Sequence, residues 1–493
     1  MRRCGALLVI AAGIGTLASE RELDLALPAE FLVGTASSAY QVEGAWNASG
    51  KAESVWDDFA HNHPGSIADG SNADTACDFY HRYARDAKML KEIGLGHFRF
   101  SISWTRIFDG ELATRPNPRG VRFYHDVLDE LERQAILPIV TLYHWDHPRR
   151  LERLGGWTNS YMAQAFADYA RFVFREFGSR VPVFVTINEP QIFCQSGYAA
   201  AEYAPAANLS DLGKYLCLQN ALKAHALAYH IYDREFRGRY KGKVGIVAQC
   251  YYYYGKSEAD SAASEVAFEF NCGSVANPIF SSEGDFPPIM KQRIRETSEL
   301  RNLSRSLLPD LSPRWIELIR GSSDFFGLNH YTSHVVESLP RSEQLQWPND
   351  EGLRHSFDPA WRTTESNWLR LVPRGFGDLL RKIKRKYGNP EVLVTECGAS
   401  DADLLNDRLR IDYLYAYMRE MLIAIKRDGC NVKAFTVWSF LDSFEWDKGF
   451  TNHFGLVNVD FSSANLTRTF KKSASWLKAV LQSRKLVDPA DFP

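Results

Sequence analysis

The sequence predicts an α/β fold, a single-domain (β/α)8 TIM barrel with long loops after its strands. Short apolar runs recur every few dozen residues along the 493-residue chain, and segments with a helical apolar period lie between them. No internal repeat, low-complexity stretch or Pro/Gly/Ser-rich linker divides the chain. A doubly wound open sheet is the alternative fold, but no glycine-rich phosphate loop follows the first run.

The apolar runs are the expected strands. They are near-continuous rather than alternating, which is typical of parallel strands buried on both faces. Helical periodicity connects them, most clearly over 163–177, 218–236 and 411–427. In chain order the expected strands are 30–37, 97–103, 136–143, 182–188, 243–249, 324–330, 392–396 and 434–440.

Composition excludes several classes of function. The 58 basic and 60 acidic side chains balance, so nothing indicates binding to nucleic acid or to an anionic membrane. Aromatic residues make up 13% of the chain, which slightly favours a carbohydrate-binding protein because sugars stack on flat rings. No cysteine or histidine spacing indicates a metal site.

The first residues resemble a signal peptide. Arg2 and Arg3 precede an apolar run over 4–17, and Ala18 suits the position before a cleavage point. We therefore expect a signal peptide over 1–18, a barrel domain over 19–493 and no membrane anchor. This predicts a secreted protein, with a digestive lumen or a lysosome as its compartment.

Sequons agree with a secretory route, whereas the cysteine usage is not that of a disulfide scaffold. Seven cysteines remain after residue 18, and an odd number leaves at least one thiol unpaired or shared between molecules. Each sequon alone is a weak signal, because such tripeptides also arise by chance. The candidate N-glycosylation sites are Asn47, Asn208, Asn302 and Asn465.

Two glutamates stand where barrel enzymes place their chemistry, at the carboxyl ends of strands. Glu189 follows the run 182–188, and Glu396 ends the run 392–396. Each alone could be an ordinary loop or helix-start acid, since Pro190 suits a first helical turn. Two carboxyl groups at one barrel mouth are the equipment for glycoside hydrolysis. Sequence gives no distance between them, so spacing leaves both retention and inversion open.

Two motifs carry a resemblance to a known family. Thr186-Ile-Asn-Glu-Pro190 and Val394-Thr-Glu-Cys-Gly398 resemble the two signature blocks of glycoside hydrolase family 1, the β-glucosidase family. The resemblance runs from about Leu25 to Leu477 and is to secreted animal-type members. It implies Glu189 as general acid/base, Glu396 as nucleophile, a retaining mechanism, and no metal or organic cofactor.

The resemblance also implies which side chains hold the sugar. Gln41 is expected at the 3- and 4-hydroxyls, His144 near the 3-hydroxyl and Asn188 at the 2-hydroxyl. Taken singly, each has an ordinary structural explanation, and their joint order carries the implication. Of the other implied positions, Asn329 and Tyr331 lie near the nucleophile, Arg99 helps keep it ionised, Trp438 stacks under the sugar, Glu445 clamps the 4- and 6-hydroxyls beside Trp446, and Phe454 forms a wall near the 6-hydroxyl.

The sequence departs from the family pattern at two positions. Cys397 stands where the nucleophile block usually has Asn, and His147 stands where Leu is common. Cys397 is expected to alter local hydrogen bonding without removing the chemistry. His147 is expected to touch the aglycone or to face solvent. Glu445 and Trp446 are intact, which favours a neutral over a phosphorylated glycone.

The leading interpretation is hydrolysis of terminal non-reducing β-D-glucosyl residues, with galactosyl and fucosyl residues as further glycones. A myrosinase-like β-thioglucosidase and a transglycosidase are the alternatives, although plant-type myrosinases lack the glutamate found here at Glu189. A klotho-like receptor is disfavoured because both glutamates are present. The expected partner is a small β-glycoside; a homodimer is one oligomeric state left open. The aglycone is expected to contact loops near Ile192, Phe193, 328–335 and Trp361.

Overall fold

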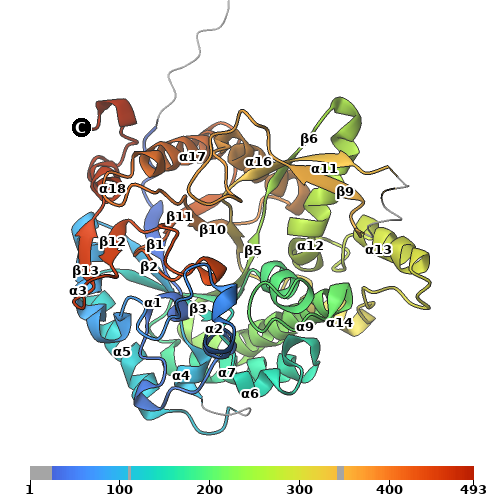
Figure 1. Ribbon diagram of the computed structural model, residues 1–493, viewed down its shortest axis with the longest axis horizontal. Helices are drawn as coiled ribbons and strands as arrows, with labels where there is room; N and C mark the ends of the chain where they lie inside the picture. The colour runs from blue at the N-terminus through green and yellow to red at the C-terminus, as the bar shows by residue number, and fades with distance from the viewer. Residues whose placement is uncertain (1–24, 109–112, 341–342, 344–348) are drawn as a thin grey trace, which may run out of the picture.

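The computed structural model describes residues 25–108, 113–340, 343 and 349–493. Eight parallel strands form a closed barrel in the order β1-β11-β10-β7-β5-β4-β3-β2, at the centre of Figure 1. The predicted fold class is confirmed, and every expected strand agrees with an observed one to within two residues at either end. The expected signal peptide lies outside the described residues. The barrel strands are β1 Leu32–Ala36, β2 His97–Ser101, β3 Leu137–Tyr143, β4 Val183–Asn188, β5 Lys243–Gln249, β7 Phe326–Asn329, β10 Val392–Cys397 and β11 Val432–Trp438.

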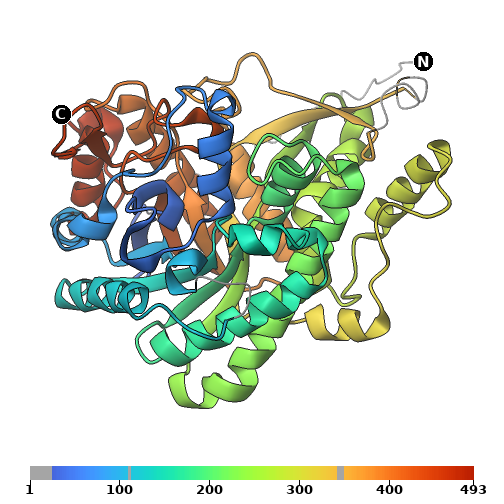
Figure 2. The ribbon, with the colours of Figure 1, turned by 60° about the horizontal axis from the view of Figure 1, so that its bottom comes forward.

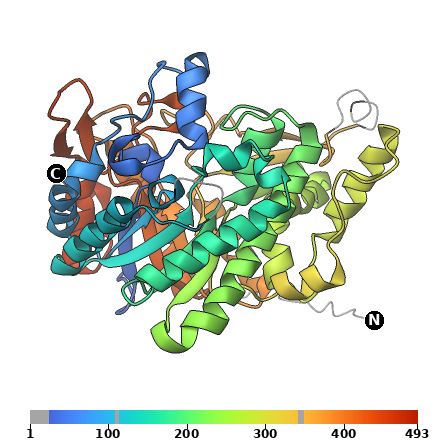
Figure 3. The same ribbon diagram turned by 90° about the horizontal axis from the view of Figure 1, so that it is seen from below.

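Helices surround the barrel (Figure 1). The three predicted helical segments correspond to α7, α9 and α17, and α9 continues into a π-helical turn at Tyr232–Phe236. Helices α13 and α14, in yellow, lie at one edge of the molecule (Figure 2, Figure 3). The longer helices are α3 Phe79–Ile93, α5 Pro118–Arg133, α7 Tyr161–Phe177, α9 Ser210–Ile231, α13 Pro288–Leu300, α16 Pro373–Tyr387, α17 Arg408–Lys426 and α18 Lys472–Ser483.

Short helices and two small sheets occupy the connections. The shorter helices are α1 Ala39–Val42, α2 Val55–Asn62, α4 Trp104–Ile107, α6 Arg149–Glu152, α8 Pro190–Phe193, α10 Arg237–Tyr240, α11 Ser261–Phe268, α12 Ser274–Phe280 and α14 Pro313–Ile319. Two small sheets, which the periodicity does not predict, comprise β6 Tyr252–Gly255, β8 Ser333–Ser338 and β9 Leu353–Ser356, and the pair β12 Val457–Asp460 and β13 Thr467–Phe470.

Apolar side chains fill the barrel interior toward the amino ends of the strands. Ile139, Val185, Val247, Leu393 and Ala434, from five different strands, form one buried cluster with Phe325. Layers of this kind make the barrel a packed core rather than a pore. Polar residues such as Asn188 and Glu396 lie at the opposite, carboxyl ends of their strands. Within the described ranges, no helix is long and apolar enough to cross a membrane.

Candidate active site

A cavity of about 510 Å³ opens at the carboxyl ends of the barrel strands. Its lining combines carboxylates, amides and aromatic rings, the mixture that a sugar with polar edges and an apolar face requires. The lining residues are His144, Trp145, Glu189, Ile192, Ser196, Glu202, Tyr203, Gln249, Tyr251, Tyr331, Asn367, Trp368, Glu396, Trp438, Glu445, Trp446, Asp447, Lys448, Asn452 and Phe454.

Glu189 enters the cavity from the residue directly after β4. Its backbone is left-handed, with φ 49° and ψ 60°, an uncommon conformation for a residue with a side chain. The side chain is 6% exposed and accepts a hydrogen bond from Asn329 Nδ2 at 2.6 Å. Burial, reinforced by the charge of Glu396, raises the pKa of Glu189 to about 8. Glu189 is therefore largely protonated near neutral pH and can donate a proton.

Glu396 lies on β10, in register with Asn329 on β7. Its Oε1 accepts a hydrogen bond from Arg99 Nη1 at 2.5 Å, and its Oε2 accepts one from the Tyr331 hydroxyl at 2.6 Å. Arg99 is 1% exposed, so its positive charge acts on the carboxylate with little screening by water. A carboxylate held by these two donors is positioned for nucleophilic attack.

One hydrogen-bond network joins the surroundings of the two glutamates. Arg99 Nη2 donates to Asn188 Oδ1 at 2.6 Å, and Asn329 Nδ2 donates to the same oxygen at 3.2 Å. Thr395 Oγ1 donates to Asn329 Oδ1 at 2.7 Å, which orients the amide so that its nitrogen faces Glu189. Side chains with several fixed partners retain their geometry when a substrate binds.

A second network fixes Glu445 and its partners. Gln41 Oε1 accepts from the Ser38 hydroxyl at 2.7 Å, so Gln41 Nε2 faces Phe444 O at 2.8 Å and Glu445 Oε1 at 3.2 Å. Trp438 Nε1 donates to the same carboxyl oxygen at 3.4 Å. Burial raises the pKa of Glu445 to about 8. A carboxyl group so placed can donate to or accept from a sugar hydroxyl.

Aromatic rings form the remaining walls. His144 lies nearly parallel to Trp438, with 5.8 Å between ring centroids, and to Trp446, at 5.9 Å. Burial and the nearby Arg99 charge lower the pKa of His144 well below its usual value, so its ring is neutral. Phe454 lies nearly parallel to Trp368, with centroids 6.4 Å apart.

The structure brings the predicted catalytic, sugar-binding and supporting residues together. Gln41, Arg99, Asn188 and Asn329 lie directly behind the lining, hydrogen bonded to residues of the cavity, and their direct contact with sugar stays a prediction. The predicted residues that line the cavity are Glu189, Glu396, His144, Tyr331, Trp438, Glu445, Trp446 and Phe454.

Several lining residues were missed by the sequence prediction. Gln249 is a polar residue at the carboxyl end of the predicted strand 243–249, so its position in the sequence could have identified it as a lining residue. Tyr251 follows two residues later. Glu202, Trp368 and Lys448 come from connecting segments where no apolar period indicates which side chain faces the cavity.

The loops expected to meet the aglycone do reach the cavity, the loop of Trp361 through Asn367 and Trp368, but two of the residues named on them do not line it. Phe193 is 3% exposed and packs against Tyr143 and Trp157, away from the cavity. Trp361 lines a different cavity beside β6 and β8, with Tyr254 and Phe357. Ile192 and Tyr331 do line the candidate active site.

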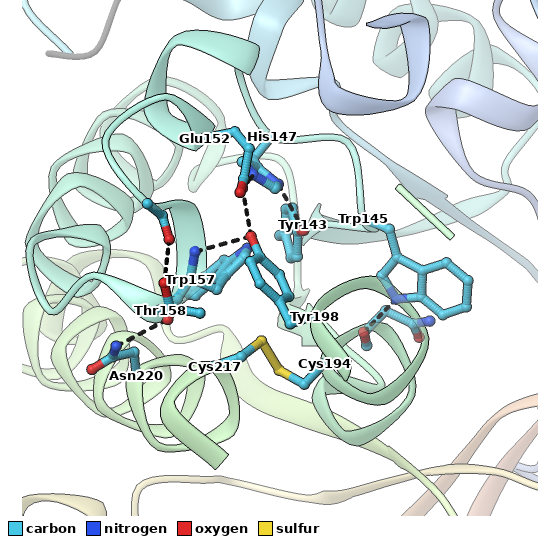
Figure 4. The surroundings of a disulfide bond; sticks show 12 residues. Tyr143, Trp145, His147, Glu152, Trp157, Thr158, Cys194, Tyr198, Cys217 and Asn220 are labelled. Atoms are coloured by element: carbon cyan, nitrogen blue, oxygen red, sulfur yellow. Dashed lines mark hydrogen bonds and ion pairs between the residues drawn. A yellow bond between two sulfur atoms is a disulfide. The ribbon is translucent and has the colours of Figure 1, made fainter. Parts of the chain in front are cut away.

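The expectation that His147 touches the aglycone or faces solvent is also wrong. His147 is 1% exposed; its Nδ1 is 3.0 Å from the Tyr143 hydroxyl and its Nε2 is 3.0 Å from Glu152 Oε2. Tyr198 donates to the same glutamate oxygen at 2.6 Å, beside the disulfide Cys194–Cys217 (Figure 4). None of these cluster residues lines the candidate active site, whereas Ile192 of α8 and Ser196 of the π-helical turn Cys194–Ala199 do.

The cysteines separate into bridged and buried groups. Cys194–Cys217 and Cys250–Cys272 are disulfides, and the free thiols of the described chain are Cys77, Cys397 and Cys430. Burial raises the pKa of the Cys397 thiol, whose sulfur is 3.5 Å from the Tyr413 hydroxyl. A buried thiol with a raised pKa is a poor nucleophile, so Cys397 acts as a small core residue.

The described residues contain no group of three His, Cys, Asp or Glu side chains that could hold a metal ion. The four sequon asparagines are all exposed, as attachment of a glycan requires. They are Asn47, Asn208, Asn302 and Asn465.

Comparison with known proteins gives a consistent result. The model of Glycosyl hydrolase family 1 matches residues 24–486. The chain is 39% identical over 467 residues to Myrosinase 1 of Brevicoryne brassicae, covering 94% of this chain and 100% of that one. It is 39% identical over 476 residues to human lactase-like protein, covering 94% of this chain and 83% of that one.

Solved structures agree with the sequence comparison. The structure of an aphid myrosinase superposes with a TM-score of 0.89 at 39% identity, covering 93% of this chain and 100% of that one. A mutant rice β-glucosidase in a covalent complex with Glc superposes with a TM-score of 0.87 at 34% identity, covering 93% and 99%.

Proposed function

The chain belongs to glycosyl hydrolase family 1, and from this premise we propose that it is a retaining β-glycosidase acting on terminal non-reducing β-D-glucosyl residues. One observation carries the proposal. The two glutamates of the cavity have opposite surroundings: Glu396 faces the Arg99 guanidinium, whereas burial raises the pKa of Glu189 to about 8. Paired carboxyl groups with such different environments can serve as nucleophile and acid.

In the first step, a Glu396 oxygen attacks the anomeric carbon of the glycoside. The bond from that carbon to the aglycone oxygen breaks, and the oxygen takes the proton of Glu189 as it leaves. A glycosyl ester on Glu396 remains. In the second step, water gives a proton to Glu189 and attacks the anomeric carbon, which releases the sugar and restores the Glu396 carboxylate. The covalent Glc complex of the rice relative supports this two-step route.

The inner cavity favours a neutral glycone. Gln41 and Glu445 provide hydrogen-bonding groups for hydroxyls, and Trp438 provides a flat apolar surface. No arginine lines the described cavity, and its lysine, Lys448, is paired with Asp447 at 2.6 Å, so a phosphorylated sugar lacks a cationic partner. Galactosides and fucosides are further candidates, since they keep the rest of the glucosyl group. A galactoside differs only at position 4, and a fucoside only at positions 4 and 6.

β-Thioglucoside hydrolysis is a second candidate, favoured by the 39% identity to a myrosinase. Both reactions use the same nucleophile on the same glucosyl carbon. They differ in the leaving atom, which is sulfur in a thioglucoside and requires less help from an acid. Transglycosylation shares the first step and differs only in the acceptor of the glycosyl group.

Release of nitrophenol from aryl β-glucoside, galactoside, fucoside, mannoside and thioglucoside tests the proposal. We expect turnover of the glucoside, and a loss of about 10⁴-fold or more in Glu396→Gln because the nucleophile is removed. Glu391→Gln is the matched control, because Glu391 directly precedes the same strand at its opposite end and pairs with Lys243. Folded protein without turnover of any substrate would refute the β-glycosidase proposal, and turnover of the thioglucoside alone would establish the second candidate.

We also propose that the protein is secreted as a glycoprotein after removal of residues 1–18. The two disulfides and the four exposed sequon asparagines support this route, since disulfides persist in oxidising compartments. Expression in a secreting cell line should release protein that begins at residue 19. Its mass should fall on enzymatic removal of N-glycans, whereas cytoplasmic retention of the full chain would refute the proposal.

A further inference from the structure

The cavity is rich in carboxyl groups and poor in cations. Its one lysine, Lys448, is held by Asp447 with 2.6 Å between Lys448 Nζ and Asp447 Oδ2, and its histidine is neutral. The lining of the described cavity contains no arginine. Five carboxyl groups line the same cavity. Those of Glu189 and Glu445, with pKa values raised to about 8, are largely protonated near neutral pH, and Glu396 is paired with Arg99 behind the lining. Glu202 and Asp447 are the remaining two.

These acids fall into an inner and an outer set. Glu189 and Glu396 are 6% and 4% exposed, and they flank the position of the reacting sugar carbon. Glu202 is exposed, Asp447 is partly exposed, and Trp368, which lines the same cavity, is 36% exposed. In the proposed reaction the glycone lies at the buried end, between Glu189 and Glu396, and the aglycone extends toward the more exposed lining residues Glu202 and Asp447.

The Tyr203 hydroxyl shows that the outer acids converge. Burial raises the pKa of Tyr203 well above its usual value, and the charges of Asp447, Glu445 and Glu202 each raise it further. Tyr203 itself lines the cavity. The two outer acids, Asp447 and Glu202, therefore act on one lining residue, together with Glu445 of the inner network.

The same region offers groups that would hold an uncharged aromatic ligand. Gln249 is 3% exposed, and its Nε2, beside the Tyr251 hydroxyl, forms no hydrogen bond of normal geometry with any described residue. A buried donor of this kind is costly unless a ligand or water accepts from it. Trp368 and Trp145 supply flat apolar surfaces on the lining.

We propose that the outer half of the cavity selects aromatic aglycones that are neutral or positively charged and rejects those carrying a carboxylate, sulfate or phosphate. Glu202 and Asp447 are the selecting residues, because the exposed Glu202 carboxylate repels an anion and Asp447 neutralises the lysine that would otherwise attract one. Gln249 favours an aglycone with a hydrogen-bond acceptor on its inner edge. This inference rests on the proposed glycosidase function, since it concerns the leaving group of that reaction.

Three probes test the selection: para-nitrophenyl β-glucoside, its analogue with a carboxylate on the ring, and its analogue with a trimethylammonium group on the ring. We expect kcat/KM to fall in the order cation, neutral, anion. Replacing both selecting residues, as Glu202→Gln with Asp447→Asn, should raise the anion-to-neutral ratio of kcat/KM about tenfold. Leaving-group reactivity cancels from this comparison, because each variant meets the same probes.

Two further measurements distinguish an effect of cavity charge from an effect of cavity shape. About 0.5 M salt should raise the same ratio in the wild type, because exposed charges are screened at that ionic strength. Glu299→Gln removes an exposed carboxylate on α13, outside the cavity lining, and should leave the ratio unchanged. A ratio that neither salt nor the double variant alters would overturn the inference.

Binding of the probes to an inactive variant tests the inference separately from the proposed function. Tryptophans line the cavity, so quenching of their fluorescence by the nitrophenyl group reports the Kd of each probe on Glu396→Gln, without turnover. The charge order in Kd together with inactive wild-type protein would retain the inference and refute the glycosidase. Active wild-type protein with equal Kd values for all three probes would support the glycosidase and overturn the inference.

Discussion

The inner and outer halves of the cavity differ in how their polar groups are satisfied. In the inner half, Arg99 alone makes four hydrogen bonds, to Thr141, Thr395, Glu396 and Asn188, at 2.5 to 3.1 Å. In the outer half, Glu202 is exposed and the Lys448–Asp447 pair is partly open to solvent. The comparison indicates that buried, fully paired groups determine the reaction, whereas open charges adjust which aglycone is accepted.

Removing Arg99 should break the inner half most severely. Arg99→Met leaves Glu396 without its cation and Asn188 without its strongest donor. We expect kcat/KM for para-nitrophenyl β-glucoside to fall about 10³-fold. Arg99→Lys retains the charge but not the fork of donors, so it should recover part of the loss. Equal activity of wild type and Arg99→Met, with the variant shown to be folded by its melting curve, would contradict the assigned importance of this network.

Protonation of Glu189 should set the alkaline side of the pH profile. Burial and Glu396 raise its pKa to about 8, so the required protonated form is present below that pH and is lost above it. We expect kcat/KM to fall about tenfold for each pH unit above 8. Glu189→Gln cannot titrate and should show a flat alkaline side, with a loss of about 10²-fold or more on substrates with poor leaving groups. An unchanged alkaline limb in the variant would assign the titration to another group.

The same division explains what the sequence could predict. Inner residues such as Asn188, Glu189 and Glu396 stand at the ends of apolar runs, and a barrel brings those ends together whatever the loops do. Outer residues such as Glu202 and Trp368 depend on loop courses, which no apolar period specifies. The small sheet of β6, β8 and β9 was missed for the same reason, because its strands of four to six residues carry no clear alternation.

The cluster around His147 sharpens the comparison, because His147, Tyr143 and Tyr198 are as buried as the inner half but do not line the cavity. His147→Leu should remove one of the partners of the Tyr143 hydroxyl, which keeps the Trp157 ring nitrogen, while Glu152 retains its bond from Tyr198. We expect Tm to fall by about 2–4 °C and kcat/KM to change less than about twofold. Glu152→Gln is the control, since an amide oxygen can still accept from Tyr198. A fall in kcat/KM of more than about tenfold at unchanged Tm would contradict this expectation. It would show that a buried, paired residue can govern the reaction even though it does not face the cavity.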